Sequence, residues 1–245
     1  MQVAVTGGTG TLGRQVVAVL ERRGHAVRAL SRSAPRHRVD LRTGAGLAAA
    51  LDGVEAVVDA ANGRPGRDAR DVLLGGTGRL LAAEAAAGVG HHVGVSIVGA
   101  DRVPFGYYEV KTAQEDLVRS GAVPWTIVRS TQFHGLLASV FASTARAHVL
   151  PGPGFPLQPV DPREVAVVVA DALEAGPSGA TIEFAGPERR SVRELAGTWR
   201  LATGRRAVVV PLPVPGAAGR ALRAGALTSA GARTGRTTFG SWLAP

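Results

Sequence analysis

A glycine-rich loop near the amino terminus constrains the fold more than any other feature of the chain. The apolar run Val3 to Val5 leads into Thr6-Gly7-Gly8-Thr9-Gly10-Thr11-Leu12-Gly13, and a helical stretch, Arg14 to Arg23, follows. Glycines at these spacings allow a sharp turn, a close approach of backbone N–H groups to a pyrophosphate, and tight packing of helix against strand. The loop therefore predicts a dinucleotide-binding βαβ unit; a purely structural turn is the alternative. The predicted cofactor contacts here are Gly7, Thr9, Gly10, Thr11, Leu12 and Gly13.

Short β-branched runs alternate with Ala- and Leu-rich helical stretches beyond this loop. The alternation is typical of βαβ units and predicts an α/β fold with a Rossmann-type doubly wound parallel sheet. With 245 residues, 45% of them apolar and 19% charged, the chain can bury a sizeable core. We expect an NAD(P)-binding domain over residues 1–150 and a small α+β substrate lobe over 151–245, packed together as one compact unit. The predicted strands after the first are Ala26 to Leu30, Ala56 to Val58, Val93 to Ile97 and Thr126 to Val128.

A second glycine cluster, Gly75-Gly76-Thr77-Gly78, resembles the first only superficially. It lies inside a predicted helix, Asp68 to Ala87, and no independent strand precedes it. We expect it to be a helix interior or a kink, with glycines that cost some stability, and not a second cofactor loop.

The end of the second predicted strand indicates which dinucleotide binds. An NAD site places Asp or Glu there for the ribose hydroxyls, whereas this chain has Leu30-Ser31-Arg32, with Arg36 and Arg38 close behind. Because arginine suits a 2′-phosphate, Ser31 and Arg32 favour NADPH (NADP) over NADH.

Further cofactor contacts are expected after the third and fourth strands. Arg38 to Leu41 is predicted as a short strand in which Asp40, with Leu41 beside it, accepts a hydrogen bond from adenine; a solvated aspartate is the alternative. The fourth strand ends in Ala60-Ala61-Asn62, small residues where a flat dinucleotide must pass closely, although ordinary packing would also select alanine.

Lys111 is the only lysine among 28 basic side chains, and it stands four residues after Tyr107 in the run Tyr-Tyr-Glu-Val-Lys. This spacing places both side chains on one face of a helix. A compact ammonium beside a phenol lowers the tyrosine pKa from about 10 toward the range useful for proton transfer. A solvated surface lysine is the alternative, and Tyr108 is the rival proton donor because it also shares a face with Lys111.

Six motifs in order resemble the atypical short-chain dehydrogenase/reductase superfamily, close to its NmrA-like NAD(P)H-binding branch. The resemblance covers residues 1–200, and its specific parts are the glycine loop and the Tyr-x-x-x-Lys pair. The motifs are the glycine loop, Ser31-Arg32, Asp40-Leu41, Val95-Ser96-Ile97-Val98-Gly99, Tyr107 to Lys111, and Val128-Arg129-Ser130-Thr131-Gln132-Phe133.

The resemblance implies a role for each matching residue. Lys111 would hold the nicotinamide ribose and lower the Tyr107 pKa, and Tyr107 would pass a proton to or from the substrate oxygen. Ser96 would hydrogen-bond that oxygen, although serine at a strand end is often only a turn residue. Phe133 and His134 would begin the substrate wall; for His134 a structural or solvated role is the alternative.

Composition restricts the partners and the location. The formal net charge is +9, yet arginines are dispersed and aromatic residues make up only 4%, so we expect no nucleic-acid partner. The chain lacks cysteine and any apolar run of membrane-spanning length, and a strand begins at Gln2, which leaves no room for a secretion signal. We therefore expect a cytoplasmic protein that does not insert into membranes. His91-His92 lack acidic partners at ligand spacing, so no metal is expected.

The carboxyl-terminal part is predicted to form the smaller lobe. Asp161-Pro-Arg-Glu164 and Ser191-Val-Arg-Glu194 each read as a capping box that opens a helix. The runs Ala180 to Ala185 and Ala207 to Val210 are expected to pair as short strands. Trp242 and Leu243 either anchor the tail or contribute to a subunit contact in a homo-oligomer.

These observations predict an NADPH-dependent oxidoreductase that reduces a carbonyl, quinone or enone group of a small-molecule substrate. The alternative is an NmrA-like sensor that binds the dinucleotide without turnover, for which the Tyr107/Lys111 pair would be unnecessary. A nucleotide-sugar epimerase or dehydratase is a third interpretation, which the short carboxyl-terminal lobe disfavours.

Overall fold

The computed structural model describes residues 1–63 and 66–244. Its residues form two compact units, and both are discontinuous in sequence. The first unit contains Met1–Ser96, Gly106–Arg129 and Arg163–Ile182, and the second contains Ile97–Phe105, Ser130–Pro162 and the chain from Glu183 onward. Each unit thus gathers separate stretches of the chain, and the boundary expected at residue 150 stays a prediction.

The main sheet has the strand order β12-β9-β6-β5-β4-β1-β2-β3, in which the edge strand β12 is Arg233–Thr234. The neighbours β4-β5, β1-β4, β1-β2 and β2-β3 are parallel, and Val5 on β1 lies between Val58 and Ala29. This arrangement confirms the predicted Rossmann-type doubly wound fold. The strands are β1 (Gln2–Thr6), β2 (Ala26–Ser31), β3 (His37–Arg38), β4 (Ala56–Asp59), β5 (His91–Ile97), β6 (Trp125–Ser130) and β9 (Thr181–Ala185).

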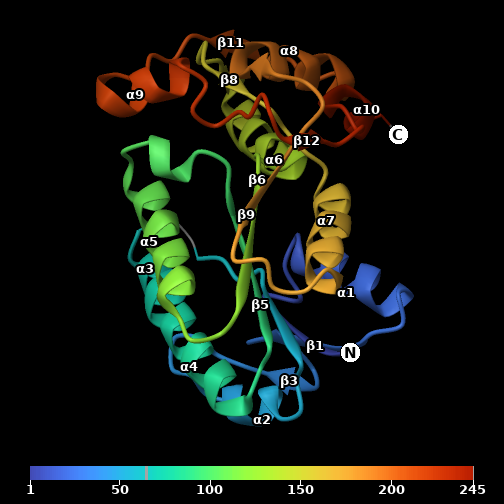
Figure 1. Ribbon diagram of the computed structural model, residues 1–245. Coiled ribbons are helices and arrows are strands. Elements are labelled where there is room, and N and C mark those ends of the chain that lie inside the picture. Colours follow the sequence, from blue (N-terminus) through green and yellow to red (C-terminus); the bar gives the residue numbers. More distant parts are fainter. Residues whose placement is uncertain (64–65, 245) are drawn as a thin grey trace. The chain divides into compact units, whose positions relative to one another are not determined.

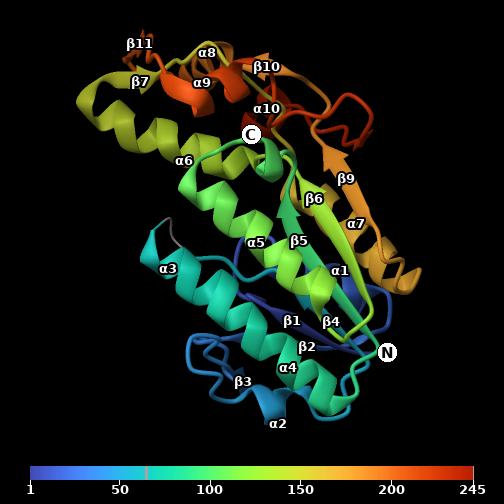
Figure 2. The same cartoon turned by 60° about the vertical axis from the view of Figure 1, so that its left-hand side comes forward.

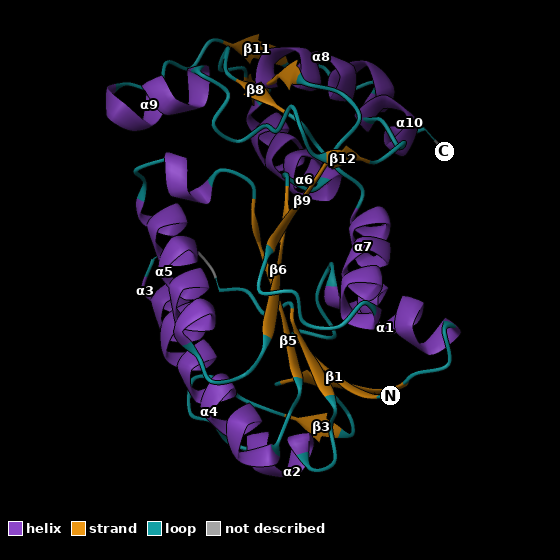
Figure 3. Cartoon of the chain, in the orientation of Figure 1, coloured by secondary structure: helices purple, strands orange, loops and turns teal. Residues whose placement is uncertain are grey.

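Helices cover both faces of this sheet (Figures 1 and 3). The helices α3, α4 and α5 lie on one face, and α1 and α7 lie on the other. In α1 the buried side chains Val16, Val19 and Leu20 follow the spacing of one helical face, which explains why this segment packs as a helix. The helices are α1 (Gly13–Arg22), α2 (Leu47–Leu51), α3 (Arg67–Arg70), α4 (Thr77–Ala87), α5 (Gly106–Ser120) and α7 (Pro162–Glu174).

The segment predicted as one helix from Asp68 to Ala87 changes its winding in the middle. Between α3 and α4 it forms a π-helical segment, η1 (Asp71–Gly76), which contains Gly75 and Gly76. A Cβ atom at Gly76 would lie 3.0 Å from the Cβ of Leu41, so glycine lets the helix pack closely against that loop. The second glycine cluster is therefore a helix interior, as predicted.

The third strand is shorter than expected. It ends at Arg38, and Asp40 lies in the following turn, where it forms an antiparallel bridge with Ala45. The Asp40 carboxylate accepts a hydrogen bond from the backbone N–H of Arg42 at 2.9 Å. Gly44 and Gly46 adopt φ angles of 80° and 84°, which turn the chain away from the sheet. The prediction of a strand through Leu41 is thus wrong.

The second unit combines short strands and helices. Its helix α8 (Val192–Thr203) packs against α6 (His134–Thr144) and α10 (Phe239–Leu243), as Figure 2 shows. The prediction that β9 pairs with the strand near residue 208 is wrong, because β9 neighbours β6 and β11 pairs with β7. The remaining elements are η2 (Ala100–Arg102), η3 (Ala145–Ala147), β7 (Val149–Pro151), β8 (Pro156–Leu157), β10 (Arg190–Ser191), β11 (Val208–Val210), α9 (Gly216–Arg223) and β12 (Arg233–Thr234).

Two predictions about this part of the chain are confirmed. Ser191 and Glu194 form the predicted capping box at the start of α8. Trp242 anchors the tail, since its ring stacks on Phe239 with centroids 6.2 Å apart and lies 5.7 Å from the ring of His134. Within residues 1–63 and 66–244, no helix combines the length and apolar character needed to cross a membrane.

Candidate functional site

The glycine loop folds back on itself between β1 and α1. The N–H of Gly10 donates to the carbonyl of Gly7 at 2.8 Å, and Gly7 adopts a left-handed φ of 61°. A side chain at Gly13 would collide with the Gly7 carbonyl, and a Cβ at Gly7 would lie 2.7 Å from the carbonyl oxygen of Ala60. Glycine is therefore required at both positions, because the backbone of β4's carboxyl end passes directly beside the loop.

The loop suits a dinucleotide pyrophosphate. Thr9, Gly10 and Thr11 are exposed, and α1 begins at Gly13 with no acidic side chain in its first turn. An exposed loop at the positive end of a helix dipole favours an anionic ligand. The fit of an NAD(P) cofactor rests on the glycines of this loop. Because they carry no Cβ atom, the pyrophosphate can approach the backbone closely.

The end of β2 brings together the residues expected to select the cofactor. Ser31 lies opposite Arg38 in the β2–β3 pairing, and its hydroxyl accepts a hydrogen bond from the N–H of Ser33 at 3.2 Å. Arg32 comes next and is exposed. Two guanidinium-bearing residues therefore flank this strand end, although their contact with a 2′-phosphate stays a prediction.

A buried carboxylate at the end of β4 organises the centre of the first unit. Asp59 is only 2% exposed, and its Oδ1 accepts hydrogen bonds from the Thr6 hydroxyl at 2.5 Å and the Ala61 N–H at 3.2 Å. Its Oδ2 accepts from Gln114 Nε2 at 3.2 Å and from the Thr77 hydroxyl at 3.3 Å. Asp59 was not singled out from the sequence; a carboxylate that ends an otherwise apolar strand is the signal that could have identified it.

Lys111 is a buried residue of α5 and not the solvated surface lysine of the alternative. Its side chain is 4% exposed, and Nζ donates to the Val95 carbonyl at 2.8 Å and to Gln114 Oε1 at 2.6 Å. Burial lowers the pKa of Lys111 to about 8, while the negative charges of Asp59 and Glu115 act against this shift. The ammonium therefore titrates close to neutrality.

Tyr107 lies one turn before Lys111 on the same helix, and its phenol points to a different partner. The hydroxyl donates to Asn62 Oδ1 at 2.7 Å, which joins two of the predicted site residues. Burial raises the pKa of Tyr107, and the hydrogen bond to Asn62 only partly opposes this. The expected lowering of this pKa by Lys111 is not what the structure gives, because the ammonium is engaged by Val95 and Gln114.

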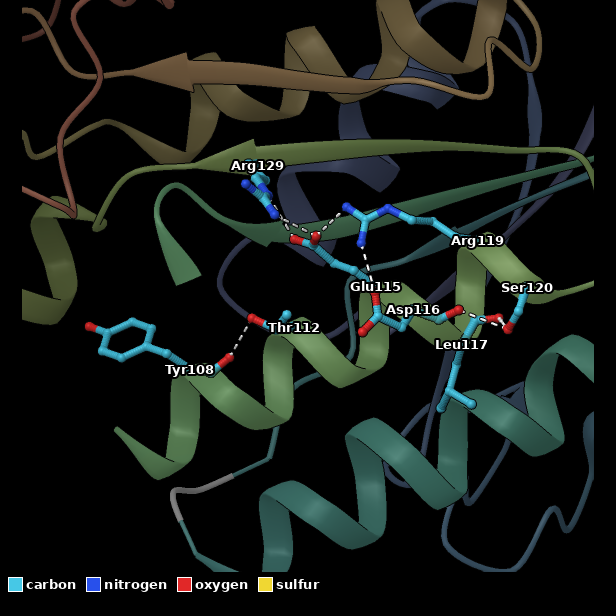
Figure 4. Close-up of polar contacts among 8 residues, drawn as sticks. All are labelled: Tyr108, Thr112, Glu115, Asp116, Leu117, Arg119, Ser120 and Arg129. Atoms are coloured by element: carbon cyan, nitrogen blue, oxygen red, sulfur yellow. Dashed lines mark hydrogen bonds and ion pairs between the residues drawn. The ribbon is translucent and has the colours of Figure 1, made fainter. Parts of the chain in front are cut away.

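Tyr108 differs from Tyr107 in its surroundings. Its ring meets that of Tyr107 edge to face, with centroids 5.9 Å apart. Burial raises the pKa of Tyr108 to about 12, with a further contribution from Tyr107. In Figure 4 its phenol points away from the charged cluster on the same helix. A phenol that resists ionisation so strongly is the weaker candidate for proton transfer.

Ser96 lies near the end of β5. The serine is 4% exposed and interacts with the Glu115 carboxylate, although its hydroxyl makes no hydrogen bond of standard geometry with the described residues. Burial alone would raise the pKa of Glu115, but hydrogen bonds from Arg129 and Arg119, together with the nearby Ser96 hydroxyl, lower it overall. Glu115 thus stays ionised next to a candidate catalytic hydroxyl, and it was not expected from the sequence.

The residues predicted to form the substrate wall belong to the second unit. Phe133 is half-buried and bridges to Val160. The His134 ring is fully buried, its Nε2 lies 3.0 Å from the carbonyl oxygen of Thr237, and it packs against Phe239 and Trp242. This packing favours the structural alternative for His134. In the described part of the chain, no cluster of three or more His, Asp or Glu side chains is arranged to hold a metal ion.

Comparison with known proteins agrees with this geometry. A family model described as NAD(P)H-binding matches residues 7–175. The (4-alkanoyl-5-oxo-2,5-dihydrofuran-3-yl)methyl phosphate reductase of Streptomyces griseus is 34% identical over 207 residues, which cover 78% of this chain and 70% of that protein.

Two solved structures share the fold. The NADPH-dependent quinone oxidoreductase of Escherichia coli, in complex with NADPH, has a TM-score of 0.80 and 20% identity over 98% of each chain. A short-chain dehydrogenase/reductase superfamily protein of Agrobacterium tumefaciens with bound NAD has a TM-score of 0.78 and 22% identity, over 99% of this chain and 95% of that one. The first of these structures holds NADPH and the second holds NAD.

Proposed function

Because the chain belongs to the NAD(P)H-binding family, we propose that it is an NADPH-dependent reductase of a small carbonyl, quinone or enone compound. The observation that carries the proposal is the placement of Tyr107 and Lys111 one turn apart on α5, with the ammonium buried and still able to donate. The name of the Streptomyces griseus relative supports oxidoreduction, and its substrate contains an oxo group on a dihydrofuran ring.

The glycine loop and the end of β2 would bind the cofactor. Gly7, Gly10 and Gly13 shape the pyrophosphate site, and Arg32 binds the 2′-phosphate through charge-assisted hydrogen bonds. The bound cofactor supplies the hydride. The Asp40 carboxylate already accepts a hydrogen bond from the Arg42 N–H, and it would accept one more from the adenine.

The residues of α5 and β5 would manage the proton. Lys111 has three N–H donors, of which Val95 and Gln114 take two, and the third would bind the nicotinamide ribose. Tyr107 would exchange its hydrogen bond to Asn62 for one to the substrate oxygen, and then transfer its proton to that oxygen. Ser96 would hold the same oxygen by a hydrogen bond.

NADPH oxidation against a panel of quinones, ketones and enones tests the proposal. A Tyr107→Phe variant should lose turnover by about 100-fold or more, because proton transfer by a positioned side chain contributes on that order. Its affinity for NADPH should stay within about threefold, since the phenol makes no contact that binding requires. Tyr108→Phe is the matched control on the same helix and should retain activity. Equal turnover in the Tyr107 variant and the wild type would remove Tyr107 from the reaction.

One observation favours a second candidate, a non-catalytic NAD(P)-binding sensor. The Tyr107 phenol donates to Asn62 and has a raised pKa, as would suit a side chain that keeps its proton. Tight NADPH binding without turnover on any member of the panel would support this sensor. Asn62→Ala separates the two candidates further, because release of Tyr107 should raise turnover in an enzyme, whereas a sensor would show no turnover before or after the substitution.

A further inference from the structure

The side chain of Gln114 stands between two buried groups of opposite charge. Its Oε1 accepts from Lys111 Nζ at 2.6 Å, and its Nε2 donates to Asp59 Oδ2 at 3.2 Å and to the Thr77 hydroxyl at 2.9 Å. Gln114 is itself 5% exposed. A single amide therefore connects the candidate cofactor-binding lysine to the carboxylate that ends β4.

The chemistry of the two partners fixes the orientation of this amide. An ammonium can only donate hydrogen bonds and an ionised carboxylate can only accept them. The amide oxygen must therefore face Lys111 and the amide nitrogen must face Asp59.

The charges explain why such a connection is needed. Lys111 and Asp59 are 4% and 2% exposed, and burying either charge without compensation is costly. The hydrogen-bond partners of Asp59 are the neutral groups of Thr6, Ala61, Thr77 and Gln114. Gln114 thus links the two charges without a direct ion pair.

Two negative groups act on Lys111, and they differ in how they are held. Asp59 on β4 and Glu115 on α5 both favour the charged ammonium. The Glu115 carboxylate is taken by Arg129 at 2.7 Å and Arg119 at 2.6 Å. Asp59 therefore offers the negative charge that is not already paired with a guanidinium, and Gln114 is the side chain that connects it to Lys111.

We propose that Gln114 is a positioning residue, which fixes the Lys111 ammonium between the Val95 carbonyl and the Asp59 carboxylate so that its third N–H donor is directed to a ligand. Two hydrogen bonds at a tetrahedral nitrogen define the direction of the remaining donor. The identity of that ligand as the nicotinamide ribose rests on the proposed function, whereas the positioning of the ammonium does not.

The absence of any other lysine makes the proposal directly measurable. Incorporation of lysine labelled with ¹³C at Cε gives one side-chain signal by NMR, that of Lys111, and its pKa can be read without cofactor or substrate. Gln114→Met removes the acceptor and the link to Asp59, so the acid dissociation constant of Lys111 should rise about tenfold. Gln114→Glu places a negative charge against the ammonium, so the same constant should fall about tenfold.

Opposite responses in these two variants are a signature that a purely structural role would not produce. Thr112→Val is the matched control on α5, because Thr112 bonds only the Tyr108 carbonyl one turn away, and it should leave the Lys111 signal unchanged. Binding of NADPH, followed by its fluorescence, should weaken about tenfold in Gln114→Met and not in the control.

Several outcomes would overturn the proposal. One is a wild-type Lys111 that titrates at the ordinary lysine value of 10.5, and another is a titration that neither Gln114 variant shifts. If Gln114→Met does not fold, the direction of the shift in Gln114→Glu decides. A protein that shows the opposite shifts yet turns over no substrate would contradict the proposed reductase and leave the positioning role of Gln114 intact.

Discussion

The Glu115 carboxylate on α5 accepts a two-point hydrogen bond from the Arg129 guanidinium on β6, at 2.8 Å from Nε and 2.7 Å from Nη2 (Figure 4). Arg119, one turn further along α5, donates to the same carboxylate at 2.6 Å. Glu115 and Arg129 are 2% and 9% exposed. This bidentate pair therefore ties the helix that carries Tyr107 and Lys111 to the central sheet.

Removal of this pair should destabilise the protein strongly. Glu115→Gln leaves Arg129 without its carboxylate, and breaking a buried pair by deleting one partner costs about 3 kcal/mol. Urea denaturation near neutral pH measures the loss of free energy of unfolding. The control is Asp116→Asn, because Asp116 pairs with Arg119 at 3.0 Å on the exposed side and should contribute less than about 0.5 kcal/mol. Equal losses in the two variants would contradict the role of the pair.

The same pair gives a pH dependence of defined sign. The pKa of Glu115 is lowered below its ordinary value of 4.5 by Arg129, Ser96 and Arg119, despite the opposing effect of burial. A carboxyl group with a depressed pKa stabilises the fold above its unfolded pKa and loses that contribution as the pH falls through the folded value. The difference in stability between wild type and Glu115→Gln should therefore shrink below pH 4.5, and a difference independent of pH would argue against an ionised Glu115.

The glycine loop should be intolerant of a methyl group at Gly13. Gly13→Ala would push a Cβ into the Gly7 carbonyl, so we expect a loss of about 2 kcal/mol or more in stability together with a loss of NADPH binding. Gly78→Ala is the matched control, because a Cβ there meets no atom within 4 Å and Gly78 lies inside α4. Calorimetry should show Gly78→Ala more stable than wild type by about 0.5–1 kcal/mol, since alanine loses less backbone entropy in a helix. Similar effects at both glycines would show that the loop is not tightly packed.

Local sequence patterns were sufficient for the elements that carry the candidate site. The glycine loop, the strands β1, β2, β4 and β5, and the helical spacing of Tyr107 and Lys111 were predicted because each depends on residues within a few positions of one another. Strand pairing at the far edge was predicted wrongly, since the choice of β6 as the neighbour of β9 depends on tertiary contacts that leave no local pattern.

The chemical state of the site could not be predicted, because it depends on residues far apart in the chain. Gln114 and Asp59 are 55 residues apart, and the hydrogen bond from Tyr107 to Asn62 spans 45. Gln114 engages the Lys111 ammonium. Burial raises the pKa of the Tyr107 phenol although the hydrogen bond to Asn62 opposes this, and the net shift is opposite to the direction expected from helical spacing alone. Spacing on a helix shows that two side chains are neighbours, whereas the surrounding strands decide which atoms meet.

Arg32 should determine the preference between the two dinucleotides. Arg32→Ala removes a charge-assisted contact to the 2′-phosphate, which is worth about 1.5–3 kcal/mol, so NADPH affinity should fall by about 10- to 100-fold. NADH lacks that phosphate and should bind as before. Fluorescence titration of both dinucleotides measures the ratio, and Arg22→Ala, at the end of α1, controls for the loss of one positive charge. An unchanged NADPH/NADH ratio in Arg32→Ala would assign the preference elsewhere.

A second buried pair, far from the cofactor loop in sequence, should make the protein sensitive to alkali. The His92 Nδ1 lies 3.0 and 2.9 Å from the two carboxylate oxygens of Glu84, and both side chains are fully buried. Burial raises the pKa of Glu84, and the charge of Glu84 raises the pKa of His92 although burial opposes this. Groups whose pKa is raised on folding stabilise the protein below their unfolded pKa and lose that contribution as the pH rises through the folded value.

As the pH rises above the ordinary histidine pKa of 6.5, the wild type should therefore lose more free energy of unfolding than Glu84→Gln, which has no carboxylate to hold a charged His92. Lys111 acts in the opposite sense above its pKa of about 8, but it is present in both proteins and cancels in the comparison. Urea denaturation at several pH values gives both slopes. Because the change of stability with pH is compared and not the stability itself, a general destabilisation by the substitution does not affect the result. If stability changes with pH equally in both proteins, the pair of Glu84 and His92 does not keep its proton above neutral pH.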